Sequence, residues 1–367
     1  MGTLGKIVGA FSVAGGAVGA IVVGGMTAQR RAVRRYKVMA SGPDVEYDAL
    51  TADRSYSVVS ADGVALYVEE VGPADAPVTA VFAHGWTLRL GAWHYQRIAL
   101  AGPGFGDPGA SPGAPEARLV FFDQRSHGRS GRAGRGRSTV GAITEDLAAV
   151  ISTAAPSGPL VIVGHSLGAM ALLGLAESDP ALFRDRVVGY ALMDTSAGYR
   201  NHQGSRPPLV GVDPVVRALT ATASRYPSLF ERGRPLTREA VWLLTRSFGF
   251  ADPDVPTHLV DYVDDMIAST PVDVIADFLP AIIGHDVRAG VPTLADLPGL
   301  IICGEADRIT PPVQSRELAA NLPKAELRVV AGAGHNLMLE NPGVSNELLR
   351  ELLRQAAIRA GIVRADK

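Results

Sequence analysis

The chain has 367 residues, 47% of them hydrophobic and 20% charged, which is typical of a globular protein with a sizeable core. Its 35 basic and 37 acidic side chains give a net charge of −2, which argues against nucleic acid as the main partner. The single cysteine, Cys303, excludes an internal disulfide, and no group of His and Cys residues has the spacing of a zinc site. We therefore expect no bound metal.

Residues 1–37 form a separate N-terminal segment with an apolar stretch and a basic flank. No charged residue occurs from position 7 to position 29, and a helix of this length spans a hydrocarbon core. Five basic residues follow between positions 30 and 37, so the positive-inside rule predicts a cytoplasmic location for the rest of the chain. We expect a transmembrane helix at 7–29 and a membrane-associated protein. Two alternatives stay open: the signal peptide of an exported protein, and a glycine-rich soluble arm on the domain surface or at an oligomer contact.

From Ser55 onward, short apolar runs alternate with helical patterns. Two alternating runs, 55–60 and 64–71, flank the turn Ala61-Asp62-Gly63 and predict a β-hairpin. Further strands are expected at 77–83, 118–122, 160–163, 186–193, 299–303 and 325–330. Helices are expected at 93–100, at 169–176 and at 344–360. Two more are expected: one from a cap at Ser138 or Thr139 to about 154, and one that follows Pro312 and ends at about 321. This alternation predicts an α/β fold with a mostly parallel sheet covered on both faces.

The alternation stops between about 197 and 297. This segment holds helical patterns at 213–224, 238–247, 257–269 and 271–283 and no convincing strand pattern. We interpret it as a helical cap, residues 198–297, inserted between two late strands of a core formed by 55–197 and 298–360. In open α/β sheets, ligands bind at the carboxyl ends of the strands, so the cap is expected to cover that edge.

The motif Gly164-His165-Ser166-Leu167-Gly168 lies between a buried strand and a run of helix formers. A sharp strand-to-helix turn raises its serine hydroxyl above the sheet, and the close packing beside it requires glycine on both flanks. The first N–H groups of the following helix favour developing negative charge. The pattern predicts that Ser166 is a nucleophile.

Four stretches in the same order resemble the α/β-hydrolase fold family over residues 55–360, which implies an eight-stranded sheet. The family's chain order of serine, acid and histidine is met by Ser166, Asp307 and His335. In such a triad the imidazole takes the serine proton and the carboxylate holds the imidazole. Asp194, which also follows a strand, is the alternative acid.

Two further stretches carry the resemblance. His84-Gly85-Trp86 matches the loop that supplies half of the oxyanion hole, so the backbone N–H groups of Trp86 and Leu167 are the expected donors. The turn from Asp123 to Ser130 matches the turn after the fourth strand.

The resemblance implies a serine hydrolase that cleaves a carboxylic ester or thioester through an acyl-enzyme, without a cofactor. The apolar cap, Trp86 and the expected anchor favour a lipophilic acyl substrate. A peptidase, an acyltransferase or a cofactor-free perhydrolase of the haloperoxidase type would use the same three residues. A non-catalytic scaffold that acts as a binding module is the alternative from another class.

Overall fold

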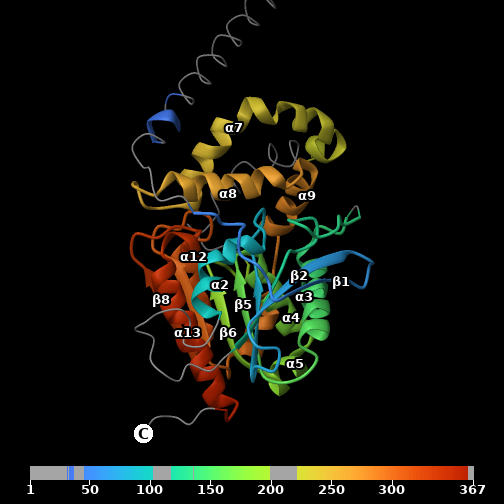
Figure 1. Cartoon of the computed structure of the whole chain (residues 1–367), viewed down its shortest axis with the longest axis vertical. Coiled ribbons are helices and arrows are strands. Elements are labelled where there is room, and N and C mark those ends of the chain that lie inside the picture. Colours follow the sequence, from blue (N-terminus) through green and yellow to red (C-terminus); the bar gives the residue numbers. More distant parts are fainter. Residues whose placement is uncertain are drawn as a thin grey trace, which may run out of the picture.

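A computed structural model of the chain describes residues 31, 33–36, 45–101, 117–134, 136–198 and 221–362. At its centre lies an eight-stranded sheet with the strand order β1-β2-β4-β3-β5-β6-β7-β8 (Figure 1). β2 is antiparallel to both of its neighbours, β1 and β4, and all other neighbouring strands are parallel. The predicted α/β fold with a mostly parallel sheet is therefore confirmed. The strands are β1 (Arg54–Val59), β2 (Ala65–Val71), β3 (Val78–Ala83), β4 (Ala117–Phe122), β5 (Leu160–His165), β6 (Val187–Met193), β7 (Gly299–Gly304) and β8 (Ala325–Val330).

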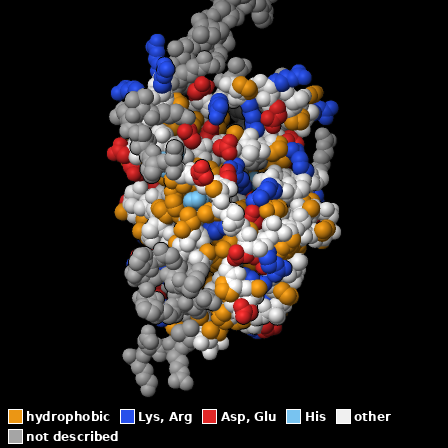
Figure 2. All heavy atoms as spheres, in the orientation of Figure 1, with side chains coloured by type: hydrophobic (Ala, Val, Ile, Leu, Met, Phe, Trp, Pro, Cys, Tyr) orange, Lys and Arg blue, Asp and Glu red, His pale blue; other side chains and the backbone are white. Residues whose placement is uncertain are grey.

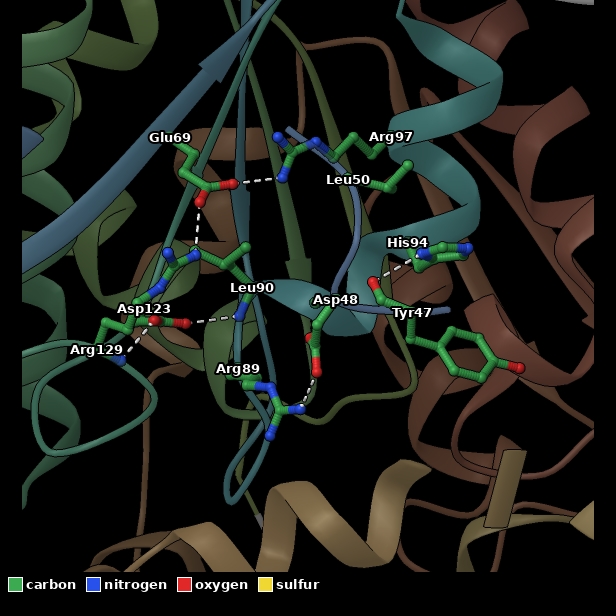
Figure 3. Close-up of a pocket in the computed structure, with 11 residues that line it drawn as sticks. Tyr47, Asp48, Leu50, Glu69, Arg89, Leu90, His94, Arg97, Asp123 and Arg129 are labelled. Carbon is green, nitrogen blue, oxygen red and sulfur yellow. Dashed lines mark hydrogen bonds and ion pairs between the residues drawn. The ribbon is translucent and has the colours of Figure 1, made fainter. Parts of the chain in front are cut away.

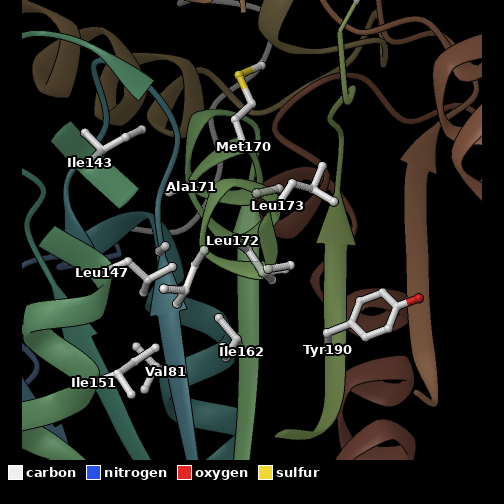
Figure 4. Close-up of a cluster of buried hydrophobic side chains, with 14 of the residues drawn as sticks. Val81, Ile143, Leu147, Ile151, Ile162, Met170, Ala171, Leu172, Leu173 and Tyr190 are labelled. Carbon is white, nitrogen blue, oxygen red and sulfur yellow. The ribbon is translucent and has the colours of Figure 1, made fainter. Parts of the chain in front are cut away.

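Helices cover both faces of the sheet, because its central strands are apolar on both sides. Every residue of β3, β5 and β7 is buried, as expected for strands in a parallel sheet between two helical layers. The helices of the core are η1 (Leu90–Trp93), α2 (His94–Leu100), α3 (Val140–Ala154), α4 (Leu167–Ser178), α5 (Pro180–Asp185), η4 (Arg288–Gly290), α10 (Val291–Leu294), α11 (Pro312–Asn321), α12 (Leu337–Glu340) and α13 (Pro342–Arg359). Figure 4 shows one layer, where Ile143 and Leu147 of α3 and Leu172 of α4 pack near Val81 and Ile162 of the sheet.

Most of the predicted helices agree with the structure in type, and their ends differ for identifiable reasons. Thr139 caps α3, since its Oγ1 accepts a hydrogen bond from the backbone N–H of Ala142 at 3.1 Å. The helix predicted at 238–247 is only the second half of α7 (Pro227–Gly249), which continues through Pro235. A proline inside a helix normally ends the pattern, so the sequence predicted a later start. The short helix α5 was not predicted, and residues 213–220 of the expected helix 213–224 lie outside the described residues.

A helical insertion lies above the carboxyl edge of the sheet, between β6 and β7 in the chain (Figure 1). It contains α7, α8 (Thr257–Ser269) and α9 (Val272–Ile283). It contacts the loops that follow three strands: Arg89 pairs with Asp265 at 3.3 Å, Arg308 Nη1 donates to the Ser247 carbonyl at 3.0 Å, and the Asn336 N–H donates to the Gly249 carbonyl at 2.9 Å. The insertion therefore encloses the sheet edge at which the predicted site residues lie.

The expected transmembrane helix at 7–29 lies outside the described residues. Among the residues that are described, no single helix is long and apolar enough to cross a membrane, and the one pair that passes the same test together, α8 and α9, is bent by 97°.

A buried arginine joins three segments of the core. Arg125, in the turn after β4, is fully buried, and its guanidinium donates to both carboxylate oxygens of Asp146 on α3, each at 2.6 Å. The same guanidinium reaches Asp62 in the hairpin turn at 2.8 Å. The turn that carries residues 123–130 is thus held to the hairpin and to α3.

We expect Arg125→Met to lower the free energy of unfolding by about 3–5 kcal/mol, because it leaves the Asp146 carboxylate buried without its counter-charge. Urea denaturation measures this difference. The matched control is Arg184→Met, since Arg184 pairs with Asp185 at 2.8 Å on the exposed surface, where an ion pair contributes little. Equal effects of the two substitutions would contradict the structural role of Arg125.

Candidate active site

The predicted nucleophile lies on a strained turn between β5 and α4. Ser166 has φ 51° and ψ −114°, a backbone conformation that residues other than glycine rarely adopt. A Cβ atom at Gly164 would lie 2.5 Å from the Ala169 Cα, and one at Gly168 would lie 2.2 Å from the Ala83 carbonyl oxygen. Both glycines of the motif are therefore required by contact with neighbouring backbone.

The structure brings Ser166, His335 and Asp307 together from three separate loops. Ser166 Oγ lies 3.1 Å from His335 Nε2, and His335 Nδ1 lies 2.8 Å from Asp307 Oδ2. All three residues are buried, and 8% of the Ser166 surface is exposed. Since Nδ1 faces a carboxylate, Nδ1 carries the proton and Nε2 is free to accept the serine proton. This is the geometry of a nucleophile, a base and an orienting acid.

The carboxylate of Asp307 is held in its ionised form. Burial would raise the pKa of Asp307, but the adjacent His335 and several hydrogen bonds outweigh burial and lower this pKa below its usual value. Oδ1 accepts from the backbone N–H groups of Ile309 at 2.8 Å and Thr310 at 3.0 Å, and Oδ2 accepts from Thr310 Oγ1 at 2.7 Å. Asp307 therefore keeps its negative charge beside the imidazole.

Contacts with the helical insertion and with the elbow fix the loop that carries His335. Glu340 accepts from the Gly334 N–H at 2.5 Å and from the Ala251 N–H, just after α7, at 2.7 Å. His165 lies within the elbow, and its Nε2 donates to the His335 carbonyl at 2.9 Å. Burial and the nearby His335 lower the pKa of His165 to about 3, so its ring stays neutral.

The two expected oxyanion donors lie at the elbow and on the loop after β3. A Cβ at Gly85 would lie 3.3 Å from the Ser166 Cβ, so this loop passes directly over the nucleophile. The Leu167 N–H is in the first turn of α4, where backbone N–H groups have no partner within the helix. Within the described part of the chain, neither the Trp86 nor the Leu167 N–H donates a hydrogen bond to another residue.

Two neutral histidines join the loop after β3 to the turn after β4. His84 Nε2 accepts from the Gln124 N–H at 3.0 Å, and His127 Nε2 accepts from the Thr87 N–H at 3.1 Å. Burial lowers the pKa of His84 to about 3 and that of His127 to about 4, so both rings remain acceptors at neutral pH. These bonds hold the residues on either side of Trp86.

A cavity of about 230 Å³ is lined by Arg89, Leu90 and Gly91, which follow the same loop (Figure 3). Its walls carry charged groups that pair with one another: Glu69 binds Arg97 and Arg129, and Arg89 binds Asp48 at 2.7 Å. Asp123 accepts from the Leu90 N–H at 2.7 Å, and burial raises its pKa to about 6. None of the residues lining this cavity belongs to the predicted triad. The bond from the Leu90 N–H to Asp123 joins the loop after β3 to the turn after β4.

Asp194, the alternative acid, does not pair with the imidazole. Its Oδ1 accepts from the Gly304 N–H at 2.8 Å, whereas His335 Nδ1 faces Asp307.

Three supporting residues escaped the sequence analysis: Thr310, Glu340 and His165. The spacing Asp307-x-x-Thr310 is a local signal for the first, because a side chain can bond backbone N–H groups two or three residues later. Glu340 and His165 act on chain segments that lie far away in sequence. Among the described residues, no group of three or more His, Cys, Asp or Glu side chains is arranged to hold a metal ion.

Comparisons with known proteins agree with this architecture. The chain is similar to a non-heme haloperoxidase from Rhodococcus erythropolis, with 26% identity over 302 residues, 79% of this chain and 96% of that protein. It is also similar to a bifunctional esterase/perhydrolase from Acinetobacter calcoaceticus, with 35% identity over 111 residues, which is 30% of this chain and only 35% of that relative.

Solved structures show the same fold. A thermophilic esterase from Thermogutta terrifontis superposes with a TM-score of 0.61 and 22% identity, covering 83% of this chain and 99% of that one. The model of the alpha/beta hydrolase family matches residues 80–347, which is most of the chain and includes Ser166, Asp307 and His335. This protein is a member of the α/β-hydrolase family.

Proposed function

We propose that this protein is a serine hydrolase that cleaves a carboxylic ester or thioester through an acyl-enzyme. The observation that carries the proposal is the continuous hydrogen-bonded line from Ser166 Oγ through the His335 imidazole to Asp307. Similarity to an esterase/perhydrolase and to esterase structures supports the same reaction class.

The geometry suggests how each group acts. His335 Nε2 takes the proton of Ser166 as Oγ attacks the carbonyl carbon, and Asp307 stabilises the imidazolium that forms. The backbone N–H groups of Leu167 and Trp86 bind the oxyanion, and losing one such donor costs about 100- to 1,000-fold in rate. His335 then gives the proton to the departing alcohol or thiol. Water, activated by the same imidazole, hydrolyses the acyl-serine and restores the enzyme.

A lipophilic acyl group is the substrate class that we favour. Trp86 lies next to Gly85, which passes over Ser166, and Trp86 packs against the hydrophobic core of the sheet. An apolar wall at the nucleophile favours an apolar acyl chain over a charged one.

Perhydrolysis is a second candidate activity, because one relative is named an esterase/perhydrolase and another a non-heme haloperoxidase. In this reaction hydrogen peroxide replaces water as the acceptor of the acyl group, and the product is a peracid instead of an acid. An acyltransferase would use another alcohol or thiol in the same step. Competition between water, hydrogen peroxide and alcohols for one acyl-enzyme separates these three activities.

We expect a fluorophosphonate probe to label the protein at Ser166. Such probes react with a serine whose proton is taken by an adjacent base, and peptide mass spectrometry locates the adduct. Ser166→Ala should abolish both labelling and hydrolysis of p-nitrophenyl esters of graded chain length. The control is Ser196→Ala, which removes another buried serine at the same sheet edge. Labelling elsewhere than Ser166, or none at all, would contradict the proposal and favour a non-catalytic scaffold.

Asp307→Asn should lower kcat by about 10⁴-fold with little change in KM, because the amide no longer fixes the imidazole with its proton on Nδ1. Steady-state kinetics with a p-nitrophenyl ester measures both parameters. A loss of less than tenfold would mean that another carboxylate, with Asp194 the first candidate, supports His335.

We further propose that the N-terminal segment anchors the protein to the cytoplasmic face of a membrane. The described residues after the apolar stretch contact the helical insertion: the Tyr36 ring lies 6.1 Å from that of Trp242, and the Arg246 guanidinium lies 4.1 Å from the Tyr36 ring centroid. Arg31, Arg34 and Arg35 are exposed beside this contact, and Figure 2 shows Lys and Arg side chains at several places along the cap end of the visible face. Basic residues at this position suit an anionic lipid surface.

Deletion of residues 7–29 should move the protein from the membrane fraction to the soluble fraction and leave hydrolysis of a short, soluble ester unchanged. Sedimentation after a carbonate wash, followed by the esterase assay, measures both properties. A full-length chain that stays soluble, or a deletion variant that stays with the membrane, would contradict the anchor.

A further inference from the structure

We propose that Asp194 is a neutral carboxylic acid that donates a hydrogen bond to the Asp307 carboxylate, so that the two carboxyl groups together hold one proton and one negative charge. Asp194 is then a positioning residue that acts on the triad acid. This inference rests on the proposed function for its effect on activity, but the location of the proton does not depend on it.

The backbone places the two carboxyl groups side by side. β6 and β7 are neighbouring parallel strands, and Asp194 follows the end of β6 while Asp307 follows the end of β7. The Asp194 N–H donates to the Ile302 carbonyl at 2.9 Å. Gly304 then joins both acids: its N–H donates to Asp194 Oδ1 at 2.8 Å, and its carbonyl accepts from the Asp307 N–H at 3.2 Å.

One oxygen of Asp194 lacks a partner that an ionised carboxylate could use. Asp194 is fully buried, and its Oδ2 has no hydrogen-bond donor among the described residues. A buried carboxylate is strongly disfavoured when one of its oxygens accepts no hydrogen bond, whereas a protonated Oδ2 needs only an acceptor. The negative charge of the neighbouring Asp307 carboxylate acts on Asp194, and we assign this carboxylate as the acceptor of the Oδ2 proton.

The surroundings decide which of the two acids keeps the proton. Burial, and then the charge of Asp307, raise the pKa of Asp194 well above its ordinary value; Glu340 on α12 acts in the same direction, and the Gly304 N–H opposes them. Asp307 faces His335 and accepts three bonds from Ile309 and Thr310, which hold its own pKa low. The Cys303 thiol, also beside this pair, stays neutral because burial raises its pKa to about 11. The proton therefore belongs to Asp194.

The backbone of Asp194 is strained, which sets it apart from an ordinary residue at the end of a strand. Its φ is 45°, in the left-handed region that residues other than Gly, Asn and Asp rarely adopt. Strain of this kind persists where the surrounding structure needs the side chain. A hydrogen bond from Asp194 would orient the Asp307 carboxylate and reduce its basicity. The imidazolium of His335 then faces one negative charge instead of two.

Asp194→Asn is the decisive variant, because an amide keeps both hydrogen bonds but has no proton to lose. We expect kcat/KM for a p-nitrophenyl ester within about threefold of the parent at pH 7, and an unchanged acidic limb of the pH profile. Difference infrared spectroscopy of the full chain should show a protonated-carboxyl stretching band in the parent that is absent in D194N. A band that persists in D194N, or a loss in kcat/KM as large as in D307N, would overturn the proposal.

Thermal unfolding supplies a second test that does not use activity. If the native state holds a proton on Asp194 that the unfolded chain releases above pH 4, native stability falls as the pH rises above that value. D194N has no such proton, so its Tm relative to that of the parent should increase from pH 5 to pH 8. A constant difference would mean that Asp194 is ionised in the native protein.

Asp194→Leu removes the donor altogether and serves as the contrasting variant. If it folds, we expect the acidic limb of kcat/KM to move to higher pH, because Asp307 without the hydrogen bond is more basic and stabilises the imidazolium more strongly. A limb that stays in place in D194L would overturn the orienting role. If D194L does not fold, the infrared band and the Tm series of D194N decide the question.

Discussion

The close packing of the elbow against the end of β3 is the constraint on which the site depends. Gly168 lies under the Ala83 carbonyl with no room for a side chain, and Ser166 accepts a left-handed backbone so that its hydroxyl faces upward. A relaxed turn would lower the strain but carry the hydroxyl away from His335. The cost of the strain is met by the surrounding core, where β3 and β5 are buried at every position.

The loops around this elbow are held by buried groups with fixed protonation states. His84, His127 and His165 are neutral because burial lowers the pKa of each, and each makes a defined bond to a neighbouring loop. His84 and His127 each accept a backbone N–H at Nε2, and these bonds join the loop that carries Trp86 to the turn after β4. Unlike these three, His335 lies between a hydroxyl and a carboxylate, where its proton can be exchanged.

The helical insertion takes part in the geometry of the site. At the end of α7, the Gly249 carbonyl accepts from the Asn336 N–H and the Ala251 N–H donates to Glu340, which also accepts from the Gly334 N–H. The position of the base is therefore coupled to the position of the cap.

The sequence by itself determined the fold class and the serine and histidine that meet, and it favoured Asp307 over Asp194 as the acid. Periodicity, the glycines of the elbow and the chain order of Ser166, Asp307 and His335 are local or ordered signals, and local backbone sterics control them. It did not exclude Asp194, because both acids follow the ends of neighbouring strands. Only the tertiary structure shows that Asp194 binds the Gly304 N–H while Asp307 faces the imidazole. The roles of Glu340 and His165 escaped it for the same reason: their partners are distant in the chain and become neighbours only when the tertiary structure forms.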